Sequence, residues 1–235
     1  GIFDLQSGCS GINYALFAAD GIVKGNNRKR ILVIGSDILS YITDFNNRST
    51  CILFSDGASS YILDSSREPG FVGHYDYGNG QLRDIITSPI KNKRHIDSPP
   101  ETYNAAPTLI MNGRKVHEVI IKLLEDTLIN FRDNHYLNPK SISLSEIKKI
   151  ILHQANCRTI EKAAANIEHK LKLRENEIKD KFIVTISDYA NSSTASQGPG
   201  LMEVVYGENK LKNDDHILMI GYGAGFSACF NHYII

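Results

Sequence analysis

The segment Ser7-Gly-Cys-Ser-Gly-Ile-Asn-Tyr-Ala-Leu-Phe-Ala-Ala-Asp20 (SGCSGINYALFAAD) places a cysteine between small residues at the start of an apolar stretch. Residues 10–24 have helical spacing, and their apolar side chains cover more than one face, which predicts a helix enclosed by protein on all sides. The next apolar run, residues 30–35 (RILVIG), is typical of a strand covered on both faces. A buried helix followed by a buried strand predicts an α/β layered fold.

The rest of the chain continues this alternation of strands and helices. Residues 50–55 and 59–64 are predicted to form a hairpin, because Asp56-Gly57 separates them. Further strands are predicted, by the same apolar patterning, at residues 70–75, 84–87, 149–153, 182–187, 216–221 and 227–235. Amphipathic spacing predicts a helix over residues 112–134 and another after residue 153, and the polar, proline-bearing residues 90–107 are expected to form a surface loop.

The beginning of the chain has a different pattern. Ile2, Phe3 and Leu5 form a strand-like run that no turn or cap precedes. We expect the chain to begin in the middle of a domain, with an N-terminal part missing.

Composition excludes several classes of function. The 235 residues, 42% of them hydrophobic, are enough to bury a sizeable core. Lys plus Arg equal Asp plus Glu at 26 each, so no strongly basic nucleic-acid surface is predicted. No stretch reaches the roughly 18 to 20 apolar residues that span a bilayer, so no membrane partner is expected. The four cysteines lack zinc spacing and are too sparse for a disulfide scaffold, which predicts free thiols and a cytoplasmic location.

Cys9 is the first candidate for chemistry. The positive end of a helix dipole stabilises a thiolate, which is the nucleophilic form of cysteine. Gly8 and Gly11 would allow backbone N–H groups to approach an oxyanion. A small buried cysteine packed against a helix start is the structural alternative.

His153 and Asn191 follow two other predicted strands. Ligands of open α/β sheets gather at the carboxyl ends of strands, so these side chains are expected to meet Cys9 there. A histidine at such a position is, taken alone, more often structural, and Asn191 could cap a helix. Residues 222–226 (YGAGF) could form either a hairpin or a loop whose backbone lines a site.

Together these motifs resemble the β-ketoacyl-acyl-carrier-protein synthase III family of the thiolase superfamily. The matching segments, in chain order, are residues 2–11 (IFDLQSGCSG), 33–37 (VIGSD), 55–58 (SDGA), 153–158 (HQANCR), 191–196 (NSSTAS) and 223–226 (GAGF). The resemblance implies a thiolase-like α/β fold of two similar halves stacked in five layers, αβαβα, with the first half truncated. Residues 1–68 would be the C-terminal part of the first half, with the nucleophile, and residues 69–235 the second half.

The resemblance also implies a condensing enzyme, an acyltransferase of fatty acid or polyketide-like biosynthesis. Cys9 would take an acyl group from acyl-coenzyme A, and the backbone N–H groups of Cys9 and Ala224 would hold the oxyanion. Malonyl-acyl carrier protein would then lose carbon dioxide, with His153 and Asn191 as donors to the enolate. Coenzyme A enters as a substrate, no metal or permanent cofactor is implied, and the family works as a homodimer.

Four further residues match positions where the family contacts coenzyme A: Arg48, Arg158, Asn156 and Gly113. A planar guanidinium suits the phosphates of this substrate, although each arginine could instead be an exposed charge.

Some positions depart from the family pattern. His117 replaces an aromatic residue beside the pantetheine tunnel, Glu118 replaces a residue that is often basic, and Ala165 and Asn166 replace a lysine pair. Residues 196–200 (SQGPG) are more glycine-rich than usual. We therefore expect altered docking of the carrier protein and a reshaped acyl pocket.

Three alternatives to condensation stay open. An acyltransferase or a thioester hydrolase could use the same acyl-cysteine, and a thiolase-fold chain could be a non-catalytic partner subunit. Papain-like proteases also carry cysteine, histidine and asparagine in this order, but their C-G-x-C-[WY] signature is absent here.

Overall fold

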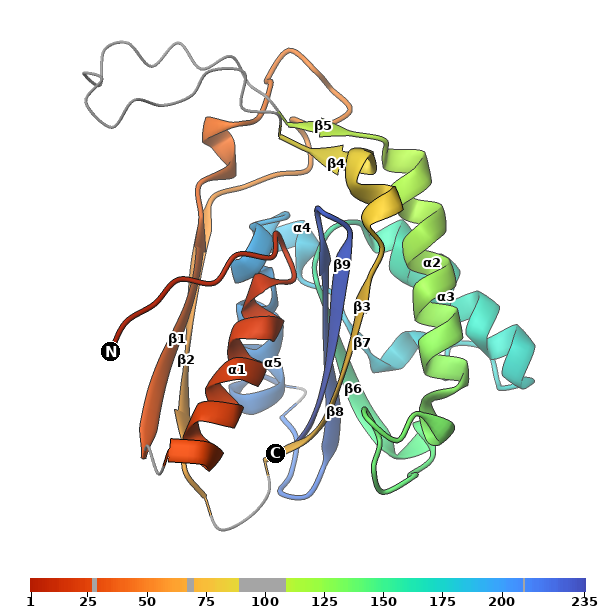
Figure 1. The fold of residues 1–235 in the computed structure, drawn as a ribbon. Helices are drawn as coiled ribbons and strands as arrows, with labels where there is room; N and C mark the ends of the chain where they lie inside the picture. Colours follow the sequence, from red (N-terminus) through yellow and green to blue (C-terminus); the bar gives the residue numbers. More distant parts are fainter. Residues whose placement is uncertain (27–28, 67–69, 89–108, 209) are drawn as a thin grey trace.

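A computed structural model describes residues 1–26, 29–66, 70–88, 109–208 and 210–235 of the chain. Four layers lie side by side in Figure 1: two helices, a five-stranded sheet, two more helices and a two-stranded sheet. The surface loop predicted over residues 90–107 lies outside the described residues. The four layers agree with part of the five-layer arrangement that the resemblance implies.

The larger sheet has the strand order β3-β9-β8-β6-β7. Its strands are β3 (Phe71–Gly78), β6 (Ile147–Leu152), β7 (Phe182–Ile183), β8 (His216–Gly223) and β9 (Ser227–Ile234). Strand β6 runs parallel to β7 and β8, whereas β9 is antiparallel to β8 and β3. Ile150 and Leu152 face one hydrophobic core and Ile151 faces the other, because successive side chains of a strand alternate between its faces.

Helices α2 (Gly113–Ile129) and α3 (Cys157–Leu171) cover one face of this sheet. Asn112 caps α2 by accepting the Lys115 N–H at 3.1 Å, and Asn156 caps α3 in the same way. Apolar side chains of both helices, such as Leu124 and Ile160, are almost fully buried against the strands. This burial holds α3 against the sheet, and residues 153–156 connect the end of β6 to the start of the helix.

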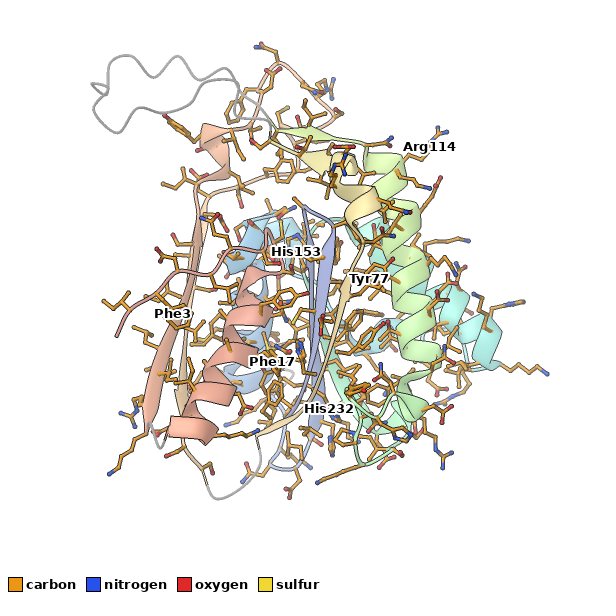
Figure 2. All side chains as sticks on the ribbon, viewed as in Figure 1. Phe3, Phe17, Tyr77, Arg114, His153 and His232 are labelled. Atoms are coloured by element: carbon orange, nitrogen blue, oxygen red, sulfur yellow. The ribbon has the colours of Figure 1, made fainter. Side chains whose placement is uncertain are left out.

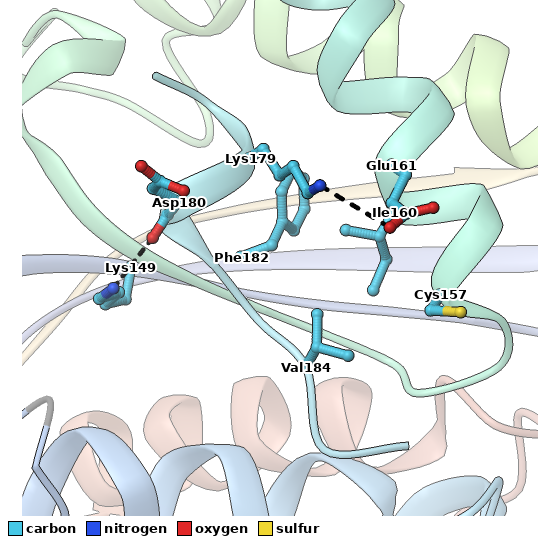
Figure 3. A pocket seen from close by; sticks show the side chains of 8 residues that line it. All are labelled: Lys149, Cys157, Ile160, Glu161, Lys179, Asp180, Phe182 and Val184. Carbon is cyan, nitrogen blue, oxygen red and sulfur yellow. Dashed lines mark hydrogen bonds and ion pairs between the residues drawn. The ribbon is translucent and has the colours of Figure 1, made fainter. Parts of the chain in front are cut away.

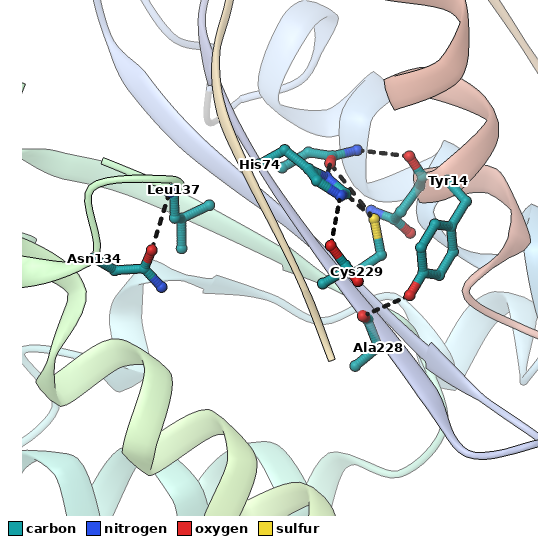
Figure 4. A network of polar contacts seen from close by, with 9 residues as sticks. Tyr14, His74, Asn134, Leu137, Ala228 and Cys229 are labelled. Carbon is teal, nitrogen blue, oxygen red and sulfur yellow. Dashed lines mark hydrogen bonds and ion pairs between the residues drawn. The ribbon is translucent and has the colours of Figure 1, made fainter. Parts of the chain in front are cut away.

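Helices α1 (Gly11–Asn26) and α5 (Gly198–Tyr206) lie on the other face. The Tyr14 hydroxyl donates to the Ala228 carbonyl of β9 at 3.1 Å, which ties α1 to the sheet (Figure 4). Ile12 and Leu16 are buried, whereas Phe17 stacks on His74 of β3, with ring centroids 3.6 Å apart, and still keeps 41% of its surface exposed (Figure 2). The prediction that α1 is enclosed on all sides is therefore wrong at Phe17, which the described part of the chain covers only in part.

Strands β1 (Arg30–Asp37) and β2 (Gly57–Asp64) form the separate antiparallel sheet. Val33 and Tyr61 face α1 and are buried, whereas Leu32 and Ile34 are 58% and 62% exposed. The prediction of a strand covered on both faces is wrong here, because among the described residues protein packs against one face alone.

Two further predicted strands are absent from the described residues. Residues 50–53 form turns, so the hairpin predicted over residues 50–64 is wrong, and β2 pairs with the earlier strand β1 instead. Residues 1–6 adopt no regular structure, and Ile2 and Phe3 are 100% and 67% exposed (Figure 2). Apolar alternation alone does not make a strand where no neighbouring strand supplies hydrogen bonds.

The remaining elements are short. Strands β4 (Ile86–Thr87) and β5 (Ile110–Met111) pair with each other, and the helix α4 (Ile186–Tyr189) occupies residues predicted to be strand, so that only β7 remains of that prediction. The 3₁₀ helices are η1 (Leu39–Tyr41), η2 (Gly80–Ile85), η4 (Phe131–Asp133), η5 (Leu144–Glu146), η6 (Lys179–Lys181) and η7 (Ser193–Gln197).

One arrangement recurs in the chain. Helix α1 precedes the antiparallel pair β1–β2, and helix α5 precedes the antiparallel pair β8–β9, each pair with eight matched positions. None of the helices in the described ranges combines the length and the apolar character that crossing a bilayer requires.

Candidate active site

Cys9 lies two residues before the start of α1, where its backbone touches the turn between β8 and β9. A Cβ added at Gly223 would lie 2.5 Å from the Cys9 nitrogen, and one added at Gly8, whose φ is +52°, would lie 2.9 Å from the Ala224 nitrogen. Both glycines are therefore needed for this close approach. It brings the backbone N–H groups of Cys9 and Ala224, the predicted oxyanion donors, onto adjoining segments.

Three serine hydroxyls hold these segments together. Ser227 Oγ, at the start of β9, lies 2.9 Å from Ser7 Oγ and 2.8 Å from Ser10 Oγ. The Ser10 hydroxyl donates to the Ser7 carbonyl at 2.7 Å. These bonds fix the residues on both sides of Cys9 relative to the sheet.

The Cys9 sulfur is in a less polar environment than its place before a helix suggests. Burial, with a smaller contribution from the nearby Asp37 charge, raises the pKa of the thiol to about 11. A hydrogen bond from the Ser193 hydroxyl, 3.3 Å from the sulfur, opposes this rise together with the Cys9 backbone N–H. The prediction that the helix terminus makes Cys9 a thiolate is therefore wrong for the free protein, and the thiol must lose its proton as it attacks.

His153 follows the last residue of β6 and is buried, with 2% of its surface exposed. Its backbone N–H donates to the Ile220 carbonyl of β8 at 2.8 Å. Burial lowers the pKa of the imidazole to about 3, against which a hydrogen bond with the Ser193 backbone acts. His153 is thus neutral at physiological pH, with one ring nitrogen as donor and the other as acceptor.

Ser196 is the hydrogen-bond partner of the His153 ring. Ser196 Oγ lies 2.6 Å from His153 Nδ1 and also accepts the Gln154 N–H at 3.3 Å. Its hydroxyl hydrogen is not used by Gln154 and can be donated to Nδ1, and in that arrangement Nδ1 is the acceptor and the proton of the neutral ring is on Nε2. Nε2 is the nitrogen that the resemblance implies as donor.

Asn191 lies at the start of the segment that leads into η7 and is 4% exposed. Its Oδ1 accepts the Ser193 N–H at 3.0 Å, the turn contact that asparagine commonly makes. This bond occupies the Oδ1 acceptor of the carboxamide, so the Nδ2 donor points away from the Ser193 N–H. The structural and the functional interpretation of Asn191 are therefore compatible.

One residue joins the three predicted side chains. The Ser193 hydroxyl contacts Cys9, its N–H contacts Asn191, and its backbone contacts His153. Tyr222 provides a second link, since its ring lies 5.1 Å from that of His153 and the charge of Cys9 contributes to raising the pKa of its phenol. The sequence indicates no catalytic role for Ser193, only that Ser192, Ser193 or Thr194 could cap a helix as well as Asn191, and its place inside the segment NSSTAS.

Three of the four residues matched to coenzyme A contacts lie at one end of the α2–α3 pair. Gly113 is the first residue of α2, and Asn156 caps α3 by accepting the Arg158 N–H at 2.9 Å. Nδ1 of His117 in α2 lies 2.9 Å from the hydroxyl oxygen of Thr159 in the first turn of α3. This contact brings the starts of the two helices together. The role of Asn156 in the structure is thus that of a cap.

Arg48 lies apart from this group. It is exposed in the segment before residue 50, which runs at the same end of the molecule in Figure 1. The structure gives no contact between Arg48 and the starts of α2 and α3 among the residues it describes. Arg158 is likewise exposed.

Two departures from the family pattern have structural reasons. Asn166 donates to Glu125 Oε1 at 2.5 Å and so ties α3 to α2, while Glu118 is exposed beside Lys115. A Cβ added at Gly198 would lie 2.6 Å from Ser59 Cβ, so this glycine allows α5 to pack closely on β2. Close packing therefore accounts for one of the two glycines in residues 196–200, the segment from which a reshaped acyl pocket is expected.

A pocket of about 450 Å³ lies beside β7 and the start of α3 (Figure 3). Ile160, Phe182 and Val184 form its apolar part, and Cys157 lies at its border. None of the candidate catalytic residues lines it. In the ranges that the structure describes, no three His, Cys, Asp or Glu side chains are grouped as a metal ion would need.

Two family models match the chain. The model of 3-oxoacyl-[acyl-carrier-protein (ACP)] synthase III matches residues 3–80, and the model of its C-terminal part matches residues 137–230. Together they cover more than half of the chain.

Named relatives agree with the family models. The beta-ketoacyl-[acyl-carrier-protein] synthase III of Ehrlichia ruminantium is 34% identical over 228 residues, and that of Clostridium botulinum is 31% identical over 225 residues. Both alignments cover 96% of this chain, which spans only 64% and 65% of those relatives' lengths, respectively. The crystal structure of 3-oxoacyl-[acyl-carrier-protein] synthase III from Aquifex aeolicus VF5 matches with a TM-score of 0.79 and 29% identity, covering 99% of this chain and 67% of that one.

Proposed function

Because the chain belongs to the 3-oxoacyl-[acyl-carrier-protein] synthase III family, we propose that it forms β-ketoacyl thioesters by decarboxylative Claisen condensation, in fatty acid or polyketide-like biosynthesis. It has the thiolase-like fold of its structural neighbours. The observation that supports the proposal most is the meeting of Cys9, His153 and Asn191 around Ser193.

The first step is acylation of Cys9. The sulfur attacks the thioester carbonyl of an acyl-coenzyme A, a carbon–sulfur bond forms, and coenzyme A leaves as a thiol that carries the proton lost by Cys9. The negative oxygen of the tetrahedral intermediate lies in reach of the Cys9 and Ala224 N–H groups. Because the pKa of Cys9 is about 11, proton loss and attack are coupled.

The second step is condensation. The malonyl group of malonyl-acyl carrier protein loses carbon dioxide, and the electron pair of the broken bond forms an enolate. His153 Nε2–H and the Asn191 carboxamide donate hydrogen bonds to the enolate oxygen. The enolate carbon then attacks the carbonyl carbon of the acyl-cysteine, and the bond between that carbon and the sulfur breaks. The β-ketoacyl thioester is released, and the Cys9 sulfur takes up one proton.

The low pKa of His153 suits this role. An imidazolium next to the thiol would not keep a free acceptor for Ser196, whereas the neutral ring keeps Nδ1 as acceptor and Nε2 as donor. Asparagine cannot take a proton at neutral pH, so Asn191 supplies a fixed dipole.

The substrates and assembly are part of the same proposal. Gly113, Asn156 and Arg158 form the surface at which coenzyme A or the carrier protein enters, and Arg48 contacts the nucleotide. Residues 1–68 and 69–235 belong to two similar halves, and the recurring helix-and-hairpin arrangement supports this division. The chain works as a homodimer, which sedimentation equilibrium can test.

Release of carbon dioxide separates condensation from its rivals. The chain is given an acyl-coenzyme A and malonyl-acyl carrier protein labelled at the free carboxyl carbon, and labelled carbon dioxide and β-ketoacyl product are measured. If the chain catalyses condensation, labelled carbon dioxide and β-ketoacyl product form in equal amounts. Cys9→Ala should form neither, and Cys157→Ala should form both. Acyl transfer or hydrolysis without carbon dioxide would overturn the proposal in favour of those reactions, and full product formation by Cys9→Ala would favour a non-catalytic partner subunit.

A further inference from the structure

Ser193 is the residue whose hydroxyl reaches the reacting atom. Its Oγ lies 3.3 Å from Cys9 Sγ and is placed to donate its single hydrogen to the sulfur. The side chain is 5% exposed. Its backbone has a φ of +53°, a left-handed conformation that residues other than glycine rarely adopt. The protein thus maintains an unfavourable backbone conformation at the point where the hydroxyl meets the thiol.

We propose that Ser193 is a further catalytic residue, whose hydroxyl stabilises the negative charge that develops on the Cys9 sulfur during attack on the thioester. The role rests on the proposed function, because it requires Cys9 to be the nucleophile. A hydrogen bond to a charged acceptor is roughly twice as strong as one to a neutral acceptor, so the hydroxyl stabilises the anionic sulfur more than the thiol. Ser193 keeps its own proton throughout.

Hydrogen bonds on both sides fix the position of Ser193. On one side, its N–H donates to Asn191 Oδ1 at 3.0 Å. On the other side, Thr194 donates its N–H and its hydroxyl to Asp37 Oδ2, at 3.1 and 2.5 Å. Asp37 and Thr194 act through Ser193 and are positioning residues. Gly11 leaves room for this arrangement, since a Cβ there would lie 3.2 Å from Thr194 Cγ2.

The charges around the sulfur explain why such a donor matters. Among the described residues, the titratable groups that face Cys9 are Asp37 at the end of β1, Tyr222 on β8 and His153 after β6. The Asp37 charge disfavours a thiolate, and His153 is neutral, so neither compensates the charge on sulfur. The Ser193 hydroxyl makes the largest contribution that opposes the rise in the pKa of Cys9.

A variant that keeps the backbone but lacks the hydroxyl tests this role. Ser193→Gly is suited to it, because glycine adopts a φ of +53° without strain. Ser193→Ala removes the same hydroxyl and keeps the Cβ. Ser192→Ala is the matched control, since it removes the neighbouring hydroxyl, which packs against Gly57. Thermal unfolding of each variant checks that it is folded.

The first readout is the rate at which iodoacetamide alkylates Cys9 at pH 8, followed by peptide mass spectrometry. Loss of the hydrogen bond should raise the thiol pKa by about one unit, and the rate should fall about threefold, because a more basic thiolate is also more nucleophilic. Ser192→Ala should match the wild type. An unchanged alkylation rate in both Ser193→Gly and Ser193→Ala would overturn the proposal.

The second readout is the single-turnover rate of Cys9 acylation by an acyl-coenzyme A. Both Ser193 variants should be about tenfold slower or more. Alkylation does not depend on the natural substrate, so the two proposals can fail separately. If the wild type is not acylated but alkylation of Ser193→Gly is slower than that of the wild type, the proposed reaction is contradicted. The hydrogen bond from Ser193 to the Cys9 sulfur is then still supported. Normal acylation with unchanged alkylation in both variants would overturn the role of Ser193 alone.

Discussion

His153 and Ser196 lie 2.6 Å apart, from Nδ1 to Oγ, and both side chains are buried. Because Ser196 also accepts the Gln154 N–H, its hydroxyl can donate to the imidazole and keep the proton on Nε2. This bond links a neutral histidine to the donor role that condensation requires.

Ser196→Ala should slow condensation more than acylation. Without the hydroxyl, Nδ1 loses its donor and the ring can adopt the other tautomer, which removes the Nε2–H donor from the site. We expect condensation about tenfold slower, and acylation of Cys9 changed by less than about twofold. Single-turnover measurements of the two steps, with Ser192→Ala as control, check this. Equal losses in both steps would contradict the tautomer assignment.

Stability should fall as the pH falls below about 6.5. The pKa of His153 is about 3 in the folded chain, against 6.5 for an unperturbed histidine, and burial lowers the pKa of His232 to about 4. Between these values the unfolded chain binds more protons than the folded one, so acid favours unfolding. For each histidine, the free energy of unfolding falls by up to about 1.4 kcal/mol per pH unit as the pH decreases through that window. Above about pH 6.5 these histidines do not change it further.

Urea unfolding at pH 7, 6 and 5 measures this dependence. His153→Gln should remove the contribution of His153 and reduce the slope, whereas His135→Gln, at an exposed position, should keep the slope. Equal slopes in the wild type and His153→Gln would show that this histidine is not held neutral by burial.

Asp37→Asn should make Cys9 more reactive. The carboxylate charge raises the pKa of the thiol, and an asparagine oxygen can still accept the hydrogen bonds from Thr194. We expect alkylation of Cys9 at pH 8 to become about two- to threefold faster, the opposite of the effect of Ser193→Gly. Asp56→Asn, at an exposed carboxylate, serves as the control. Slower alkylation of Asp37→Asn would mean that its positioning of Thr194 outweighs its charge.

Gly223→Ala should disrupt the oxyanion site. Its Cβ would lie 2.5 Å from the Cys9 nitrogen, so the two backbone segments must separate. We expect acylation at least about a hundredfold slower, as for the loss of an oxyanion donor. Gly78→Ala is the control, since an added Cβ meets no atom within 4 Å there. Acylation at the wild-type rate in Gly223→Ala would show that Cys9 and Ala224 do not share the oxyanion.

Strands that follow a simple local pattern could be predicted from the sequence. The apolar runs before His153 and at residues 216–221 form β6 and β8, and the helix after Cys9 begins where the small residues suggest. The conformation of residues 50–53 could not be predicted, because these residues form turns and the partner of β2 is the earlier strand β1. Whether a segment forms a strand there depends on which distant segment it pairs with, and the periodicity of apolar residues does not show that pairing.

The candidate site shows the same division. Cys9, His153 and Asn191 could be found because each follows a recognisable pattern and belongs to a recognisable family motif. Ser193 could not, since one serine among several hydroxyl residues carries no signal of the atom it contacts. The reactivity of Cys9 was also predicted with the wrong sign, because a position before a helix is visible in the sequence whereas burial and a nearby carboxylate depend on the folded chain.

Every step proposed for this chain requires covalent acylation of Cys9, which intact-protein mass spectrometry detects after exposure to a panel of acyl-coenzyme A thioesters. We predict a mass gain equal to one acyl group for at least one donor, retained in Cys157→Ala and lost in Cys9→Ala. No gain for any donor, or the same gain in Cys9→Ala, would show that Cys9 is not the acylated nucleophile.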